Sequence, residues 1–244
     1  MKDNFSSEAG AYATYRPQYP DAFFDYLRTL PMQFGNAWDC GTGSGQVAAG
    51  LAPLFHQVHA TDISASQLQH AVKLPNIHYS MQPAEETHFP SHFFDLVIAG
   101  QAAHWFNLDK WYAEVRRTGK EHAWIIILGY GNISITPAVD SVVLKLYKDI
   151  LGSYWDQERR YIDEHYRTLP FPFREVAPPP FTINYTWTRA HLLGYLRTWS
   201  AWRHFKARNG KDPIEAIEKD LEHAWGDTLS REITFPVLLR VGKL

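Results

Sequence analysis

A chain of 244 residues is long enough for one α/β domain with a sizeable core and short for two domains. Its 24 basic and 26 acidic residues give a net charge of −2, which argues against the basic surface that nucleic-acid-binding proteins use. The single cysteine, Cys40, excludes an internal disulfide and the paired cysteines of zinc ribbons and thioredoxins, so we expect a reducing compartment and no metal site.

The predicted elements of the first half alternate between helices and strands. A helix over residues 19–30 precedes strands predicted at 37–40, 56–61, 77–81, 94–99 and 123–128, and the helices between them are predicted at 47–55, 64–72 and 109–117. This alternation is typical of a doubly wound parallel sheet. The longest apolar run, 123–128, is far shorter than the roughly 20 residues of a membrane-spanning helix, and the polar N-terminus lacks a signal-peptide core. We therefore expect a cytoplasmic protein without a membrane partner.

The second half interrupts the alternation. Helices are predicted at residues 138–150, 157–166, 189–197 and 214–225, strands at 181–187 and 230–241, and an irregular proline-rich stretch at 170–180. We predict a single domain made of an N-terminal cap (1–34), a cofactor-binding core (35–131), a helical lid insertion (132–180) and a C-terminal part of the sheet (181–244). The lid should cover the carboxyl ends of the strands, where open α/β sheets bind ligands.

The strongest motif is DCGTGSG at residues 39–45, which places an acid at a strand end and three alternating glycines before a helix. Glycine allows the backbone to approach a ligand and to adopt positive φ angles. A dinucleotide fingerprint requires glycine or alanine where Gln46 stands, and a phosphate-binding loop requires a lysine that this segment lacks. The motif therefore disfavours an NAD-dependent oxidoreductase, and an ordinary glycine-rich turn is the alternative interpretation.

Asp39, Gly41, Gly43 and Gly45 resemble the first motif of the class I S-adenosylmethionine-dependent methyltransferases, of the methyltransferase type 11 kind. The resemblance implies a Rossmann-like, mostly parallel seven-stranded sheet with an antiparallel last strand. Asp62 ends the second strand, where an acid accepts hydrogen bonds from ribose hydroxyls, although it could instead cap the next helix. Further cofactor contacts implied by the resemblance are Thr42, Ile63, and Ala84 and Glu85 in the segment PAEE, where Pro83 replaces an aspartate common in relatives.

The segment GQAAHWF at residues 100–106 resembles the loop that lies beside the methyl-bearing sulfur in this family. The resemblance implies that Gln101 and Ala102 contact the cofactor, that His104 is the catalytic residue, and that Trp105 forms a wall of the acceptor pocket. A purely structural role is the alternative for His104.

Two further segments, FSSEAGAYATYRPQYP at 5–20 and LGYLRTWSA at 193–201, resemble the trans-aconitate and juvenile-hormone-acid type of small-molecule methyltransferases. The resemblance implies that Tyr15 and Arg16 close over the cofactor and that Arg197 and Trp199 bind the acceptor. Arg16 can form a bidentate contact with the methionine carboxylate or with an acidic acceptor. Arg203 is a further candidate for contact with an acidic acceptor.

These patterns predict methyl transfer from S-adenosylmethionine to a small molecule, with S-adenosylhomocysteine as the product, by a monomer or homodimer. The predicted nucleophile is an oxygen such as a carboxylate, which is ionised at neutral pH and needs no base, whereas a hydroxyl would need His104. The alternative function is a catalytically silent regulatory protein that binds S-adenosylmethionine or a nucleotide. The glycine motif at residues 39–45 is complete and an acid, Asp62, stands at the ribose-binding position, so the sequence favours the enzyme.

Overall fold

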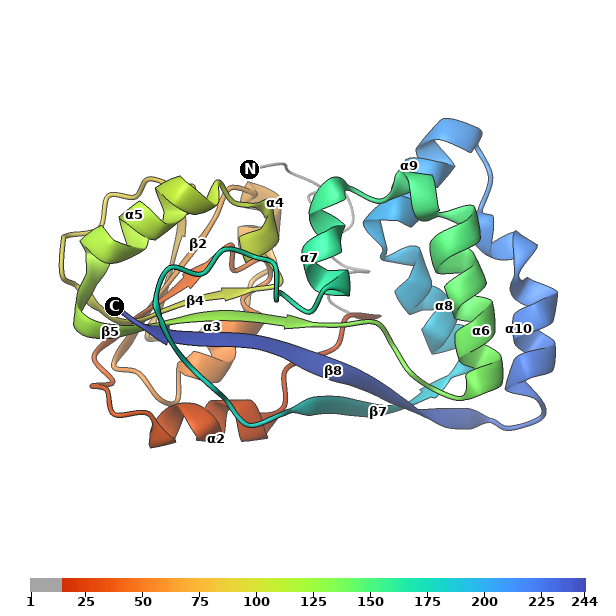
Figure 1. Ribbon diagram of the computed structural model, residues 1–244, viewed down its shortest axis with the longest axis horizontal. Helices are drawn as coiled ribbons and strands as arrows, with labels where there is room; N and C mark the ends of the chain where they lie inside the picture. The colour runs from red at the N-terminus through yellow and green to blue at the C-terminus, as the bar shows by residue number, and fades with distance from the viewer. Residues whose placement is uncertain (1–14) are drawn as a thin grey trace.

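The computed structural model describes residues 15–244 as a mixed sheet flanked by helices (Figure 1). The strand order is β3-β2-β1-β4-β5-β8-β6, and β7 pairs with β8 outside this path. Five strands form the parallel part, namely β1 (Asn36–Cys40), β2 (Gln57–Asp62), β3 (Ile77–Met81), β4 (Phe94–Gly100) and β5 (Gly119–Tyr130). β8 (Ser230–Lys243) runs antiparallel to β5, to β6 (Arg174–Val176) and to β7 (Thr182–Thr188). The predicted mostly parallel sheet with an antiparallel last strand is confirmed.

Apolar side chains project from both faces of the central strands. Helices pack on both faces and bury these side chains. On one face Ile126 contacts the cluster formed by α2 (Asp21–Thr29) and α3 (Gln46–Leu51). On the other face Ile125 and Ile127 pack in the cluster formed by α5 (Leu108–Thr118). Because successive residues of β5 alternate between the two clusters, this strand needs the continuous apolar run that its sequence shows.

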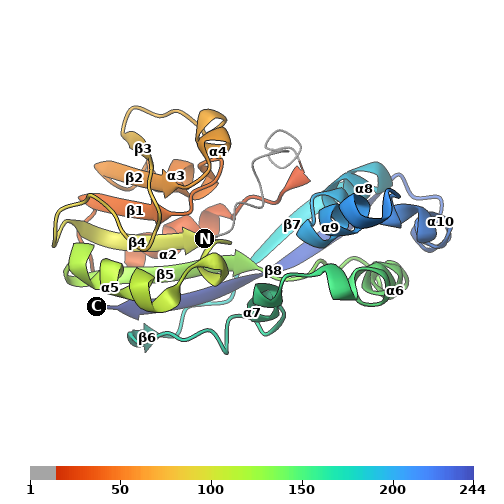
Figure 2. The same cartoon turned by 90° about the horizontal axis from the view of Figure 1, so that it is seen from above.

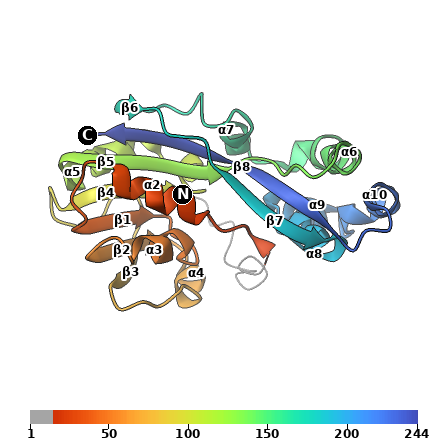
Figure 3. The ribbon, with the colours of Figure 1, turned by 90° about the horizontal axis from the view of Figure 1, so that it is seen from below.

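A helical layer lies beyond the carboxyl ends of the parallel strands, over the extension of β7 and β8 (Figure 2). Its helices share one apolar core that includes Trp187, Leu221 and Phe235. They are α6 (Pro137–Lys145), α8 (Arg189–Arg197), α9 (Ser200–Asn209) and α10 (Glu218–Trp225). The short α7 (Arg160–Asp163) lies between this layer and the parallel strands (Figures 1 and 2). The predicted lid segment is thus packed together with helices that follow it in the sequence. Figure 3 shows the long β8 extending from its place beside β5 to the helical layer.

Several elements differ in detail from the sequence prediction. The expected helix at 138–150 ends as a π-helix, η3 (Leu146–Ile150), and the expected irregular stretch contains the edge strand β6. The expected helix at 157–166 consists of η5 (Gln157–Arg159) and α7, and it ends where His165 and Tyr166 adopt φ angles of 55° and 59°. α9 was not predicted. Within residues 15–244 no helix combines the length and apolarity needed to cross a membrane.

Candidate active site

The glycine motif forms the turn between β1 and α3. Gly41, Gly43 and Gly45 have φ angles of 65°, 55° and 80°, which other residues rarely adopt. A Cβ atom at Gly41 would come within 2.8 Å of the Ala102 Cβ, whereas the nearest atom of residues 15–244 to one at Gly43 would be Oε1 of Gln67, at 3.8 Å. The loop is therefore packed tightly at Gly41, and its backbone is open to a ligand at Gly43.

Asp39 lies at the end of β1 beneath this loop and is 1% exposed. Its Oδ2 atom accepts hydrogen bonds from the Thr42 hydroxyl at 2.5 Å and from the Ala48 N–H at 3.0 Å. Its Oδ1 atom is buried and has no hydrogen-bond partner among residues 15–244. Burial raises the pKa of Asp39 to about 7, and the neighbouring Asp62 acts in the same direction.

Asp62 joins the glycine loop to the start of α4 (Ala65–Gln69). Its Oδ2 atom accepts a hydrogen bond from the Gly43 N–H, and its Oδ1 atom accepts one from the Ser64 N–H, both at 2.9 Å. The side chain of Ser64, and not that of Asp62, forms the N-cap of α4. Asp62 thus holds the loop in place, and it also lines the cavity above the loop.

The first cavity opens over the glycine loop at the carboxyl ends of the strands. The space between its walls is about 870 Å³, a figure that includes space open to solvent. Most of the predicted cofactor-binding residues line it, namely Arg16, Asp39, Gly41, Thr42, Gly43, Asp62, Ile63, Gln101 and Ala102. Gly45 lies behind the loop as the N-cap of α3.

A second cavity adjoins the first. The two share Arg16, Gln101 and Trp105, and the second encloses about 460 Å³, including space open to solvent. The predicted residues His104 and Trp199 line it. Its other lining residues are Trp155, Arg159, Ile162 and Ser200. Within the described residues 15–244 this lining contains two arginines and no carboxylate, so the cavity favours anionic ligands.

His104 is 8% exposed and belongs to a chain of polar groups beside the second cavity. Its Nδ1 atom lies 3.4 Å from the Tyr166 hydroxyl, which lies 3.4 Å from Oε1 of Gln101. The Gln101 amide donates a hydrogen bond to the carbonyl oxygen of Tyr130 at 3.3 Å. Burial, together with the positive charge of Arg159, lowers the pKa of His104 to about 3, so the imidazole is neutral at neutral pH.

The structure places several predicted residues outside both cavities. Tyr15 packs against Gly194, with its ring centroid 5.1 Å from that of His191. Ala84 is buried in the apolar cluster that includes residues of α5, and Oε1 of Glu85 accepts a hydrogen bond from the Asn107 N–H at 3.0 Å.

The side chain of Arg197 is 43% exposed and forms an ion pair with Asp212 at 2.9 Å. Neither Arg197 nor Arg203 is among the described residues that line these two cavities. The predicted acceptor contact of Arg197 is therefore not supported by its position, because Arg197 is paired with Asp212 at the surface.

Residues 155–166 form one wall of the second cavity, and the sequence motifs did not identify them. Trp155, Arg159, Ile162 and Tyr166 are spaced four, three and four residues apart. This spacing places side chains on one face of a helical segment, and it is the signal that could have identified the wall. The first three residues line the second cavity, and Tyr166 lies behind it against His104.

Comparisons with known proteins point to one family. The family described as a methyltransferase domain matches residues 38–127. A Dictyostelium discoideum protein named as a candidate methyltransferase is 32% identical over 249 residues, covering 99% of this chain and 95% of that protein. The structure of a candidate type II methyltransferase from Anaeromyxobacter dehalogenans is 41% identical, with a TM-score of 0.86, and the match covers 94% of this chain and 98% of that one. A Saccharomyces cerevisiae protein named as a candidate S-adenosylmethionine-dependent methyltransferase is 26% identical over 65% of this chain and 59% of its own length.

The chain belongs to the class I S-adenosylmethionine-dependent methyltransferases, and the predicted enzyme class and cofactor are confirmed. The residues of the first cavity fit this cofactor. The buried Oδ1 atom of Asp39 provides an acceptor for an ammonium group, and the open backbone at Gly43 allows close approach. When bound, the cofactor supplies a methyl group on a positively charged sulfur.

Proposed function

We propose that the protein transfers the methyl group of S-adenosylmethionine to an oxygen atom of a small anionic molecule, such as a carboxylic acid. The observation that carries this proposal is the second cavity. It adjoins the cofactor cavity through Arg16, Gln101 and Trp105, and its lining, as far as the described chain shows, includes two arginines without a carboxylate. An arginine that remains available beside the cofactor, in a cavity lined by aromatic side chains, suits a flat molecule with a negative charge.

The lowered pKa of His104 also favours an acceptor that is already ionised. A histidine whose pKa is lowered to about 3 is a weak base at neutral pH, so it would remove a proton from a hydroxyl group inefficiently. A carboxylate needs no such step. The resemblance of residues 5–20 and 193–201 to methyltransferases of organic acids supports the same class of acceptor, although residues 5–14 lie outside the described residues.

In this proposal the protein acts mainly by positioning. Asp62 holds the ribose hydroxyls, Arg16 pairs with the methionine carboxylate, and the loop at Gln101 and Ala102 lies beside the reacting groups. Displacement at the methyl carbon requires the oxygen, the carbon and the sulfur in one line, and positioning of this kind lowers a barrier by up to about 7 to 11 kcal/mol in the best cases. Trp105 and Trp199 exclude water, which strengthens the contacts between charges.

A silent binding protein is the less supported alternative. Such a protein would be expected to have a disrupted glycine loop or a displaced ribose acid, but Gly43 and Asp62 are joined by a hydrogen bond beside the cofactor cavity. The net charge of −2 supports a small-molecule acceptor over a nucleic acid. A monomer or homodimer remains our prediction for the assembly.

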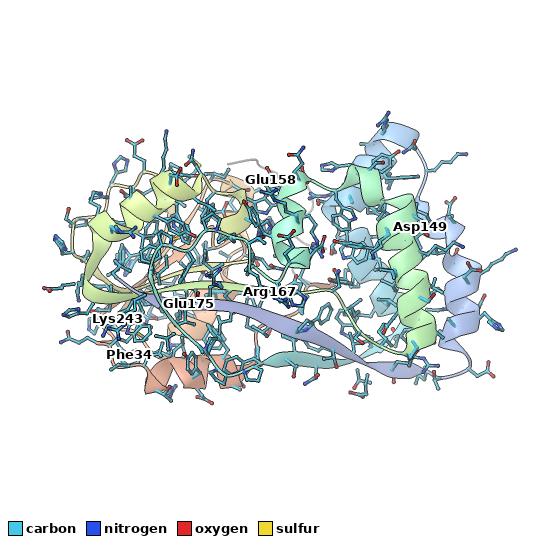
Figure 4. All side chains as sticks on the ribbon, viewed as in Figure 1. Phe34, Asp149, Glu158, Arg167, Glu175 and Lys243 are labelled. Carbon is cyan, nitrogen blue, oxygen red and sulfur yellow. The ribbon has the colours of Figure 1, made fainter. Side chains whose placement is uncertain are left out.

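A thermal-shift titration with S-adenosylmethionine, S-adenosylhomocysteine and NAD tests the cofactor site. We expect both adenosyl ligands to raise the unfolding temperature and NAD to leave it unchanged, because selective binding stabilises the folded state. The variant Asp62→Ala should bind S-adenosylhomocysteine about tenfold to a hundredfold more weakly, because it loses hydrogen bonds to a charged group. Asp149→Ala, in the outer helical layer (Figure 4), is the matched control. Equal affinities in Asp62→Ala and the native protein would contradict the assigned ribose contact.

Acceptor screening tests the reaction itself. Small carboxylic acids are incubated with S-adenosylmethionine, and methyl esters are detected by mass spectrometry. Formation of an ester supports the proposal, whereas methylation of amines alone among a mixed panel of acids, phenols and amines would overturn it.

A further inference from the structure

We propose that Arg159 binds an anionic group of the methyl acceptor and thereby selects charged over neutral acceptors. This inference rests on the proposed function, and it assigns the selectivity to a residue that the sequence motifs do not mark. Arg159 belongs to η5, immediately before α7, and its side chain is 18% exposed. It lines the second cavity and not the cofactor cavity.

Neighbouring groups hold the Arg159 guanidinium in one orientation. Its Nε atom donates a hydrogen bond to the Tyr147 hydroxyl at 2.9 Å, and its Nη2 atom donates one to Oδ1 of Asn132 at 2.6 Å. The guanidinium carbon lies 5.4 Å from the ring centroid of Tyr147 and 4.9 Å from that of Trp155. An arginine fixed in this way is organised in advance for a carboxylate, so little side-chain entropy is lost on binding.

The neighbouring acid compensates the charge of Arg159 only in part. Oδ1 of Asp163 is 3.6 Å from the Arg159 Nε atom, and the same oxygen accepts a hydrogen bond from Tyr147 at 2.6 Å. Asp163 is exposed and does not line the cavity. The positive charge of Arg159 is also one cause of the lowered pKa of His104 across the cavity, which is consistent with a field that extends into it.

The other arginine of the cavity has different surroundings. Arg16 lines both cavities, and it donates hydrogen bonds to the Tyr130 hydroxyl at 2.9 Å and to the carbonyl oxygen of Thr198 at 3.0 Å. Its position at the junction suits the methionine carboxylate of the cofactor. Arg159 is then the cation available to the acceptor alone, and Trp155 and Trp199 provide flat walls for the body of a small unsaturated or aromatic acid.

Binding of matched charged and neutral probes tests this assignment. Benzoate, phenylacetate and cinnamate are each compared with their amides, by calorimetry on the protein saturated with S-adenosylhomocysteine. We expect at least one carboxylate to bind about tenfold to a hundredfold more tightly than its amide, the range of a hydrogen bond to a charged group. Arg159→Gln should abolish this preference and leave the affinity for S-adenosylhomocysteine unchanged.

Arg160→Gln is the matched control. Arg160 is the next residue, is exposed and contacts Tyr161 instead of the cavity, so its loss should leave the preference unchanged. If Arg159→Gln loses affinity for S-adenosylhomocysteine, Arg159→Lys is compared with it, because the lysine keeps the positive charge. A preference that Arg159→Lys retains and Arg159→Gln loses supports the assignment, and a preference that Arg159→Gln retains overturns it.

The outcomes separate this inference from the proposed function. A native protein that prefers carboxylates, together with an Arg159→Gln variant that keeps the preference, would leave the proposed acceptor class intact and remove Arg159 from it. A native protein that prefers no carboxylate to its amide would contradict both.

Discussion

The imidazole of His104 lies against Trp105, with ring centroids 4.9 Å apart, in a buried position that disfavours its charged form. The folded pKa of about 3 is below the ordinary value of 6.5 that applies in the unfolded chain. As the pH falls below 6.5, the unfolded state takes up a proton at this residue and the folded state does not. Stability is therefore lost as the pH falls from about 6.5 towards 3.

The variant His104→Gln should lack this dependence. From pH 7 to pH 5 the native protein should lose about 2 kcal/mol more unfolding free energy than the variant, since one pKa unit corresponds to about 1.4 kcal/mol. Urea unfolding of both proteins at the two pH values measures the difference. The contribution of Asp39, whose pKa is raised, is present in both proteins and cancels to first order. Parallel losses would show that His104 is protonated in the folded state.

At the residue scale, the sequence predicted those parts of the site that are local in the chain. Gly43 and Asp39 lie within one motif, and Asp62 follows at the next strand end, so their proximity depends only on β1 and β2 being neighbours. Arg159 reaches the second cavity because the chain returns after β5 and places η5 against residues 103–105. That return depends on tertiary packing, which a single sequence does not specify.

The turn between β1 and α3 illustrates how one element depends on glycine for two separate reasons. Gly45 has a φ of 80°, and a Cβ atom there would overlap the hydroxyl group of Tyr79. Gly210, at the C-terminal end of α9, has a similar φ of 68°, but a Cβ atom there would meet no atom of the described part of the chain within 4 Å. Substitutions at Gly45 and Gly210 therefore distinguish two effects: both introduce backbone strain, but only the one at Gly45 also introduces steric overlap.

We expect Gly210→Ala to lower the unfolding free energy by about 1 to 2 kcal/mol, the cost of a left-handed conformation in a residue with a Cβ atom. Gly45→Ala should cost about 1 to 3 kcal/mol more, because Tyr79 must also move away from its hydrogen bond to the carbonyl oxygen of Val72. Urea unfolding measures both. Equal losses would mean that the segment around Tyr79 adapts without cost.

Also at the element scale, strands were predicted better than helices. β4 and β5 carry unbroken apolar runs, because both of their faces are buried, and such runs are unambiguous when they are bounded by polar turns. In the second half, the helices predicted at 138–150 and 157–166 are each divided into shorter elements of different type. α7 ends at Asp163 and is followed by His165 and Tyr166, which both have positive φ angles, and the Tyr166 hydroxyl lies 3.4 Å from Nδ1 of His104. No local pattern of residues indicated that ending.

At the scale of the whole molecule, β8 joins the two parts of the protein. One half of β8 completes the sheet beside β5, and the other half pairs with β7 under the helical layer. The two cavities therefore lie where these parts meet, and Arg16, Gln101 and Trp105 belong to both. A ligand in the first cavity consequently forms part of the surroundings of a ligand in the second.

This shared wall predicts that cofactor and acceptor binding are coupled. The carboxylate that binds best in the probe series should bind about fivefold or more tightly when S-adenosylhomocysteine is present, which lies at the lower end of usual coupling energies. By thermodynamic linkage, the carboxylate must increase the affinity for S-adenosylhomocysteine by the same factor. Calorimetric titrations with either ligand added first should therefore give the same factor. In Arg159→Gln, whose acceptor contact is removed and whose cofactor cavity is intact, the carboxylate should no longer alter S-adenosylhomocysteine affinity. Equal carboxylate affinities with and without S-adenosylhomocysteine would mean that the shared residues do not transmit binding between the cavities, and the acceptor site would then be complete before the cofactor arrives.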